Sequence, residues 1–257
     1  MMNSFYVAAL GMQAQKSQLD VVSNNLSNAN TAGYKRERVD FSALLDRQVQ
    51  GVVAGDKATG TVGTSAALSS LHRDLSQGEL RATDSVLDLA INGQGLLEVA
   101  LADDRSAYVR GGSLKVNQDG FLTTASGYLL KSDVRIPPNA GELAIDAKGV
   151  VTARLGDDTQ RTELGRLQLV QFANLDALNY LGNGVFTAPE GVEPGVKGYP
   201  QEEGLGSIAS GKLEMSNVKL VDEMVALMMA QRVYELNSKV AQAADELMGM
   251  TNSLRRG

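Results

Sequence analysis

The chain has 257 residues, of which 43% are apolar, and its 24 Lys and Arg against 30 Asp and Glu give a formal net charge of -6. This size allows one large domain or two modest ones, and the acidic balance argues against a general nucleic-acid or anionic-membrane binder. The sequence has no Cys and one His, which excludes disulfides, thiolate nucleophiles, Cys-ligated zinc and His-pair metal sites.

An amphipathic helix is predicted near the start of the chain, over residues 3–26. Its apolar side chains share one heptad-like phase, comprising Met2, Phe5, Ala9, Met12, Leu19 and Leu26. The following run from Asn24 to Gly33 is rich in Asn and Ser, which compete for backbone hydrogen bonds and should end the helix. Polar residues such as Lys16 and Asp20 interrupt the apolar run, so we expect no Sec signal peptide.

Residues 31–70 are predicted to form a flexible or extended connection. The stretch from Tyr34 to Phe41 alternates enough to be extended, and its basic residues suit either contact with a partner chain or a solvated charged strand. Residues 51–70 are rich in Gly, Ala, Ser and Thr. Such small side chains bury too little apolar area to offset chain entropy, so this part should be flexible or lightly ordered.

A mostly antiparallel β domain is predicted over residues 71–205, where short apolar runs alternate with turn residues. Three hairpins are expected, with turns at Asn92-Gly93, at Asp119-Gly120 and over residues 146–149. Residues 167–172 alternate as a strand with one buried face. We therefore expect sheet structure through this whole region.

A long helix is predicted over residues 216–255, with Ser216-Asn217 as its N-cap. Its main apolar row has sustained a/d heptad spacing and comprises Ala226, Met229, Val233, Leu236, Val240, Ala243, Leu247, Met250 and Leu254. A second row comprises Leu220, Met224, Leu227, Tyr234, Ala241 and Met248. Such rows lay one helix against others. The N-terminal helix should cover one row, and other subunits should cover the second row.

The predicted fold class is α+β. Residues 1–30 and 216–257 should form a discontinuous terminal coiled-coil domain, and residues 71–205 an inserted β domain that follows the connection. The two helices stand at opposite ends of the sequence with everything else between them, which is why the β domain reads as an insertion.

Catalytic chemistry is not indicated anywhere in the sequence. His72 is best interpreted as a surface or turn histidine, and the pairs Asp103-Asp104 and Asp157-Asp158 as turn residues. Gly93-Gln94-Gly95 lacks the further glycine and the Lys-Ser/Thr pair of a phosphate loop. We predict no catalytic, metal or cofactor-binding residues, no cofactor and no small-molecule substrate. A monomeric β-domain binding module and a cell-wall-cleaving enzyme remain the alternatives to a structural subunit.

Two terminal motifs carry a family resemblance. The first is Asn24-Asn25-Leu26-Ser27-Asn28 followed by residues 31–36, and the second comprises residues 216–218, 223–225 and 231–239. Residues 87–95 and 108–113 resemble middle-domain motifs of the same family, the bacterial flagellar axial proteins of the rod and hook. Length and the run 231–239 favour the distal rod, while residues 46–70 and 85–88 leave a proximal-rod or hook-type subunit as alternatives.

The resemblance implies a non-enzymatic subunit that polymerises with itself into the helical rod crossing the periplasm and contacts neighbouring rod and hook proteins. It also implies passage through the flagellar export apparatus without a cleaved signal peptide. The terminal helices would form the inner coiled-coil layer. The expected assembly interface comprises Phe5, Met12, Leu19, Asn24, Asn25, Leu26, Leu227, Val233, Tyr234, Leu236, Val240, Leu247, Met250 and Leu254.

Overall fold

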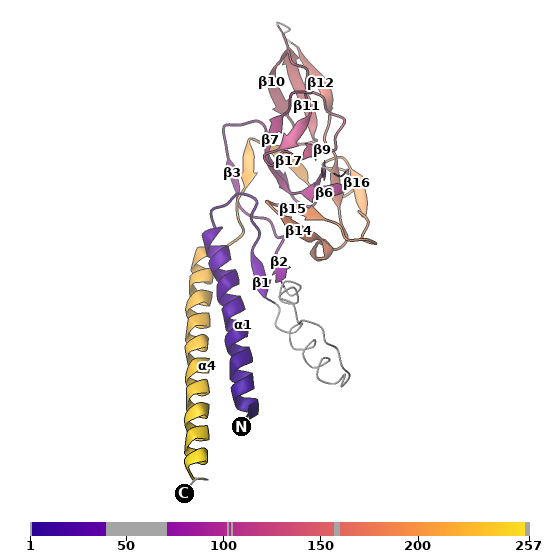
Figure 1. The fold of residues 1–257 in the computed structure, drawn as a ribbon. Coiled ribbons are helices and arrows are strands. Elements are labelled where there is room, and N and C mark those ends of the chain that lie inside the picture. The colour runs from indigo at the N-terminus through magenta and orange to yellow at the C-terminus, as the bar shows by residue number, and fades with distance from the viewer. Residues whose placement is uncertain (1, 40–70, 102, 104, 157–159, 255–257) are drawn as a thin grey trace. The chain divides into compact units, whose positions relative to one another are not determined.

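The computed structural model describes residues 2–39, 71–101, 103, 105–156 and 160–254. It contains two compact units (Figure 1). The helical unit holds the described residues of 1–29, 36–74 and 218–257, and the β-rich unit holds those of 30–35 and 75–217. The α+β class is therefore confirmed. Among the described residues, no helix combines the length and the apolar character needed to cross a membrane.

The helical unit is built on two antiparallel helices, α1 (Met2–Ser27) and α4 (Leu220–Leu254), which lie side by side (Figure 1). Asn25 near the end of α1 contacts Glu223 near the start of α4. A Cβ built at Gly11 would lie 2.9 Å from the Nδ2 atom of Asn237. The helices thus approach closely where α1 has no side chain. This unit also contains a short antiparallel pair, β1 (Glu37–Val39) and β2 (Leu71–Arg73).

The limits of these elements match the sequence expectation in some places and differ in others. The N-terminal helix is confirmed, but α4 begins at Leu220, so the predicted N-cap at Ser216-Asn217 is wrong. The amide of Asn217 instead donates to the carbonyl and hydroxyl oxygens of Ser76. The structure groups residues 36–39 and 71–74 with the helices. The flexible connection predicted across residues 40–70 lies outside the described residues.

The β-rich unit contains short strands that pair antiparallel throughout the described ladders. Nine strands form one sheet in the order β14-β15-β6-β5-β9-β8-β7-β4-β17, and the remaining strands of the unit form the sheets β10-β11-β12, β13-β16 and β18-β3. Their bounds are β3 (Leu80–Ala82), β4 (Asp88–Asn92), β5 (Leu97–Ala100), β6 (Ser106–Val109), β7 (Gly111–Val116), β8 (Leu122–Thr124), β9 (Leu129–Leu130), β10 (Ala140–Ile145), β11 (Val150–Leu155), β12 (Arg161–Arg166), β13 (Leu169–Gln171), β14 (Asn179–Gly182), β15 (Val185–Thr187), β16 (Val196–Gly198), β17 (Ser207–Ser210) and β18 (Lys212–Glu214), with a 3-10 helix η1 (Leu175–Ala177).

Two of the three predicted hairpins are confirmed, namely β7–β8 and β10–β11. Both turns use the same local chemistry. The side-chain oxygen of Asn117 accepts from the backbone N–H groups of Asp119 and Phe121, and Asp146 does the same for Lys148 and Val150. Such side-chain-closed turns are encoded within a few residues, which is why the sequence predicts them.

The hairpin predicted at Asn92-Gly93 is wrong. β4 pairs with β7 and β17, and β5 pairs with β6 and β9, so the two strands on either side of this turn are not partners. Asn92 pairs with Ser207 instead, and a Cβ at Gly93 would lie 3.1 Å from the Cα of Gly206. Strands distant in the sequence therefore occupy both edges of β4, and the chain leaves it at this turn.

The core of the β-rich unit lies among the inward side chains of its sheets. Its main cluster includes Leu89, Ile91, Leu97, Val99 and Leu169. The predicted strand over residues 167–172 is shorter than expected and is buried on both faces, since Leu169 and Val170 are each fully buried. Leu96 and Val170 exchange two backbone hydrogen bonds of 2.8 Å, which tie β13 to the segment before β5. A strand buried on both faces need not alternate between apolar and polar residues. The prediction of a single buried face is therefore wrong.

The close pairing of β4 with β7 depends on Gly111, and we predict a large loss of stability when it is changed. Gly111 has a φ of 113°, and an added Cβ would lie 2.4 Å from the carbonyl oxygen of Leu89. Gly112 has a φ of 119° but open space around it. Gly112→Ala should cost about 1–3 kcal/mol of unfolding free energy through backbone strain, and Gly111→Ala should cost about 1–3 kcal/mol more through overpacking. Urea unfolding of both variants measures the difference; equal losses would contradict this account.

Candidate functional site

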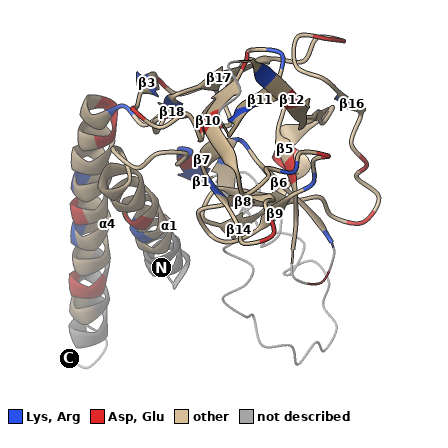
Figure 2. Cartoon of the chain, turned by 90° about the horizontal axis from the view of Figure 1, so that it is seen from above, with Lys and Arg blue, Asp and Glu red and all other residues tan. Residues whose placement is uncertain are grey.

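An exposed apolar row runs along α4 and is the most distinctive surface of the helical unit. Met229 is 63% exposed, Leu236 is 60% exposed and Val240 is 53% exposed. These residues belong to the predicted a/d row, together with Val233 and Met250, which are also exposed. Figure 2 shows that charged residues along α4 are separated by stretches of other residues. A soluble chain rarely leaves so many large apolar side chains in one row unless another surface covers them.

The side of α4 that faces α1 coincides with neither predicted apolar row. Glu223 and Ala230 are buried, and Leu227, Asn237 and Ala241 are half-buried at the same helical spacing. The prediction that α1 covers one apolar row and leaves the other to other subunits is therefore wrong. The face against α1 shares only Leu227 and Ala241 with the second row, whose Met224 and Tyr234 are exposed. On this face α1 approaches closely at Gly11, which lies against the amide side chain of Asn237 rather than against a large apolar side chain.

The remaining predicted interface residues are distributed over the same two helices. Asn24 and Tyr234 are exposed, Asn25 is buried, and Met12, Leu19 and Leu26 are half-buried. The side chains of Phe5, Leu247 and Leu254 lie outside the described residues. The single chain thus buries Asn25 against α4 and leaves Val233, Tyr234, Leu236, Val240 and Met250 on the surface.

Asn25 is the centre of a buried polar cluster in the helical unit. Its Nδ2 atom donates to the carbonyl oxygen of Glu37 at 2.9 Å, and its Oδ1 atom accepts from the N–H of the same residue at 2.9 Å. Nδ2 also lies 3.2 Å from an oxygen of Glu223. One amide side chain therefore joins α1, β1 and α4, so Asn25 supports the helix pair from inside.

Ion pairs complete this cluster. Arg36 Nε lies 2.5 Å from Oε1 of Glu223, whose side chain is almost fully buried. Arg73 pairs with Glu37 across the β1–β2 ladder. A buried carboxylate without such partners would cost several kcal/mol. These contacts therefore fix the segment after α1 against the first turns of α4.

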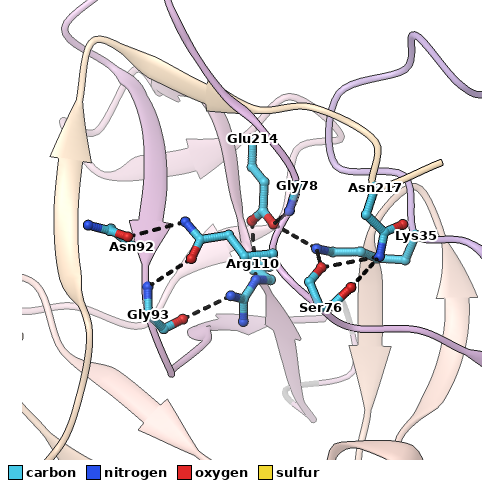
Figure 3. Close-up of polar contacts among 9 residues, drawn as sticks. Lys35, Ser76, Gly78, Asn92, Gly93, Arg110, Glu214 and Asn217 are labelled. Atoms are coloured by element: carbon cyan, nitrogen blue, oxygen red, sulfur yellow. Dashed lines mark hydrogen bonds and ion pairs between the residues drawn. The ribbon is translucent and has the colours of Figure 1, made fainter. Parts of the chain in front are cut away.

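A second buried cluster lies in the β-rich unit, around Glu214 (Figure 3). Lys35 Nζ is 2.6 Å from Oε1 of Glu214, and Arg110 Nε is 3.1 Å from Oε2. The backbone N–H of Gly78 also donates to Oε1 at 2.8 Å. Arg110 continues to the carbonyl oxygen of Gly93 at 2.8 Å. The run 108–113 and the turn after β4 are thus linked through Arg110.

The expectation of a solvated charged strand after the N-terminal helix is wrong for Lys35 and Glu37, which are 3% and 7% exposed. Sequence reasoning missed these clusters because each of them joins segments that are distant in the sequence. The partners are far apart in the chain, for example Lys35 and Glu214. The signal that could have revealed them is that Lys35 and Glu223 belong to the two terminal motifs. A charge that only faces water has no reason to belong to such a motif.

Glu98 forms a further charge cluster on the β-rich unit and allows a pH prediction. Burial opposes ionisation of this carboxyl, but hydrogen bonds from Lys197 and Ser106 and the nearby Lys131 lower its pKa below the ordinary value of 4.5. A lowered folded-state pKa stabilises the fold above the ordinary pKa, and that contribution is lost as the pH falls through the folded value. Glu98→Gln should therefore destabilise the fold at neutral pH and approach wild type in strong acid. Thermal melts across that range measure this, and a pH-independent difference would contradict it.

Three family models match the chain. Residues 5–35 match "Flagella basal body rod protein", residues 90–153 match "Flagellar hook protein FlgE/F/G D1 domain", and residues 209–254 match "Flagellar basal body rod FlgEFG protein C-terminal". The matched regions contain α1 with the run to Lys35, the centre of the β-rich unit, and α4 with β18. Both buried clusters therefore contain residues of the matched regions, and the exposed row of α4 lies within one of these regions.

Similar proteins extend over the full length. The chain is 34% identical to the flagellar basal-body rod protein FlgG of Borreliella burgdorferi, covering 100% of both chains. It is 35% identical to FlgG of Caulobacter vibrioides, covering 99% of this chain and 100% of the relative. It is 31% identical to FlgG of Bacillus subtilis, covering 100% of both. The chain therefore belongs to the flagellar basal-body rod family.

Proposed function

We propose that the chain is the structural subunit of the distal flagellar rod, where its terminal helices pack with those of other subunits as a coiled-coil layer. The observation that carries this proposal is the exposed apolar row of α4, with Met229, Leu236 and Val240 each more than half exposed. Membership of the rod and hook family implies self-polymerisation and neighbouring rod and hook proteins. The row supplies a surface for those contacts.

Burying a large aliphatic side chain stabilises an interface by about 1.5–3 kcal/mol relative to leaving it in water. Several such residues at heptad-like spacing on α4 would give one subunit a continuous strip for a neighbouring helix. A rod built in this way needs no catalytic residue, because its work is to transmit torque from the motor to the hook. The subunit would reach the growing rod through the flagellar export apparatus, without a cleaved signal peptide, and would lie in the part that crosses the periplasm.

The assignment to the distal rod is tested by finding which flagellar structure retains the protein. Cells carrying a small epitope on the chain are sheared to remove filaments, extracted with detergent, and the hook–basal bodies are immunolabelled for electron microscopy. We expect label on the rod at its hook-proximal end. Label on the hook itself would assign a hook-type subunit, and label beside the inner-membrane rings would assign a proximal one; either result would overturn the distal assignment.

A further inference from the structure

The chain passes between its two units at four places, after residues 29, 35, 74 and 217. In the β-rich unit, the segments that lead to these places are 30–35, the stretch after residue 74, and the stretch that ends at residue 217. We propose that the Glu214 cluster is a mechanical anchor that fixes these segments to one another. This inference rests on the proposed function, since an anchor of this kind is useful to a subunit that transmits torque.

The side-chain contacts converge on one carboxylate (Figure 3). Glu214 is 4% exposed and receives Lys35 from the first segment and the N–H of Gly78 from the second. Lys35 Nζ also donates to the carbonyl oxygen of Ser76 at 2.6 Å. The residue that carries the carboxylate stands at the end of β18, in the third segment. One buried ion pair therefore joins all three.

Backbone contacts reinforce the same arrangement. The N–H of Gly33 donates to the carbonyl oxygen of Glu214 at 2.8 Å. The N–H of Met215 donates to the carbonyl oxygen of Glu79, also at 2.8 Å. A Cβ at Gly78 would lie 1.9 Å from the carbonyl oxygen of Met215. The second and third segments thus approach backbone to backbone, which a side chain at residue 78 would prevent.

The helical unit ties its own ends of these segments in a comparable way. Arg36, the residue after Lys35, pairs with Glu223, and its carbonyl oxygen accepts from the N–H of Asp74 at 2.9 Å. Consecutive residues 35 and 36 are therefore each held by a carboxylate in a different unit. A single peptide segment rotates readily about φ and ψ and transmits little torque. Several segments held together at both ends resist such rotation.

Lys35→Met tests the anchor in the purified full-length chain. It removes the ammonium donor but leaves Glu214 with Arg110 and Gly78. We expect amide hydrogen exchange at Gly33 to accelerate at least tenfold, while the core amide of Val99 is unchanged. Lys115→Met, the same change at an exposed site in this unit, should leave both amides as in wild type. Unchanged exchange at Gly33, or equal acceleration at Val99, would overturn the anchor. If Lys35→Met does not fold, Lys35→Arg is measured in the same way, because it keeps the charge but displaces the donor.

Flagellated cells then test the mechanical role. Cells with Lys35→Met should build rods in near-normal numbers, yet their swimming speed should fall more steeply than that of Lys115→Met cells as medium viscosity rises. A wild-type viscosity curve together with faster exchange at Gly33 would overturn the torque role of the anchor. Rods that lack the protein altogether in wild-type cells would instead refute the proposed function and leave the exchange result standing.

Discussion

Val240→Asp is expected to abolish rod assembly and motility while leaving the unfolding of the single chain unchanged. Val240 is 53% exposed on α4, so a carboxylate there remains hydrated in the free chain. In an assembled rod the same carboxylate would be surrounded by apolar side chains, which would cost several kcal/mol or force it to be protonated. Motility assays and counts of rods in extracted basal bodies measure the loss.

Gln242→Asp is the matched control, because it adds the same charge at another exposed position of α4. Gln242 stands outside the apolar row, at helical spacing from Glu235, Lys239 and Glu246. The Gln242→Asp variant should support nearly normal motility. If Val240→Asp lowered the melting temperature of the monomer by several degrees yet permitted assembly, α4 would pack through this row within its own chain, and the account would be wrong.

Glu223→Ala should have the largest effect on the helical unit itself. Its side chain is almost fully buried against Arg36 and Asn25, and removing one partner of a buried ion pair costs about 3–5 kcal/mol. The equilibrium constant for local opening of the cluster should then rise by a factor on the order of a hundred or more. Amide exchange at Glu37, whose N–H donates to Asn25, measures this opening.

Asp222→Ala provides the comparison for that result. Asp222 is exposed in the same first turn of α4 and shares the favourable position near the helix N-terminus. The Asp222→Ala variant should lose less than about 1 kcal/mol of unfolding free energy, as expected for a surface charge near a helix dipole. Equal effects of the two variants would mean that Glu223 acts only as a helix-end charge and that the cluster contributes little.

The elements that the sequence predicts well are those encoded by neighbouring residues. The heptad-like spacing predicts both helices, and α1 (Met2–Ser27) begins and ends within a residue of expectation. The turns closed by Asn117 and Asp146 carry their own hydrogen-bond acceptors. In each case the determining contacts are separated by four residues or fewer, so pattern and turn chemistry suffice.

The features that sequence reasoning misses depend on contacts between distant segments. Asn92-Gly93 has the composition of a hairpin turn, but β17 and β7 pair with the two edges of β4. The strand after the turn, β5, therefore does not pair with β4. Lys35 and Glu214 are 179 positions apart, and Asn25 and Glu223 are 198 apart, so neither pair is visible as a pattern. α1 packs on a face of α4 that carries Glu223 and Asn237 rather than on either apolar row, and such polar contacts leave no apolar pattern in the sequence.

The exposed row of α4 is the central feature of this account, and cysteine accessibility tests it most directly. The chain has no Cys, so Val240→Cys introduces a single thiol, and Gln242→Cys introduces one outside the row. We expect a maleimide reagent to label both variants in the free chain. In extracted hook–basal bodies it should label Gln242→Cys and leave Val240→Cys protected. Equal labelling of Val240→Cys in the free chain and in the assembled rod would contradict the claim that this row is the assembly surface.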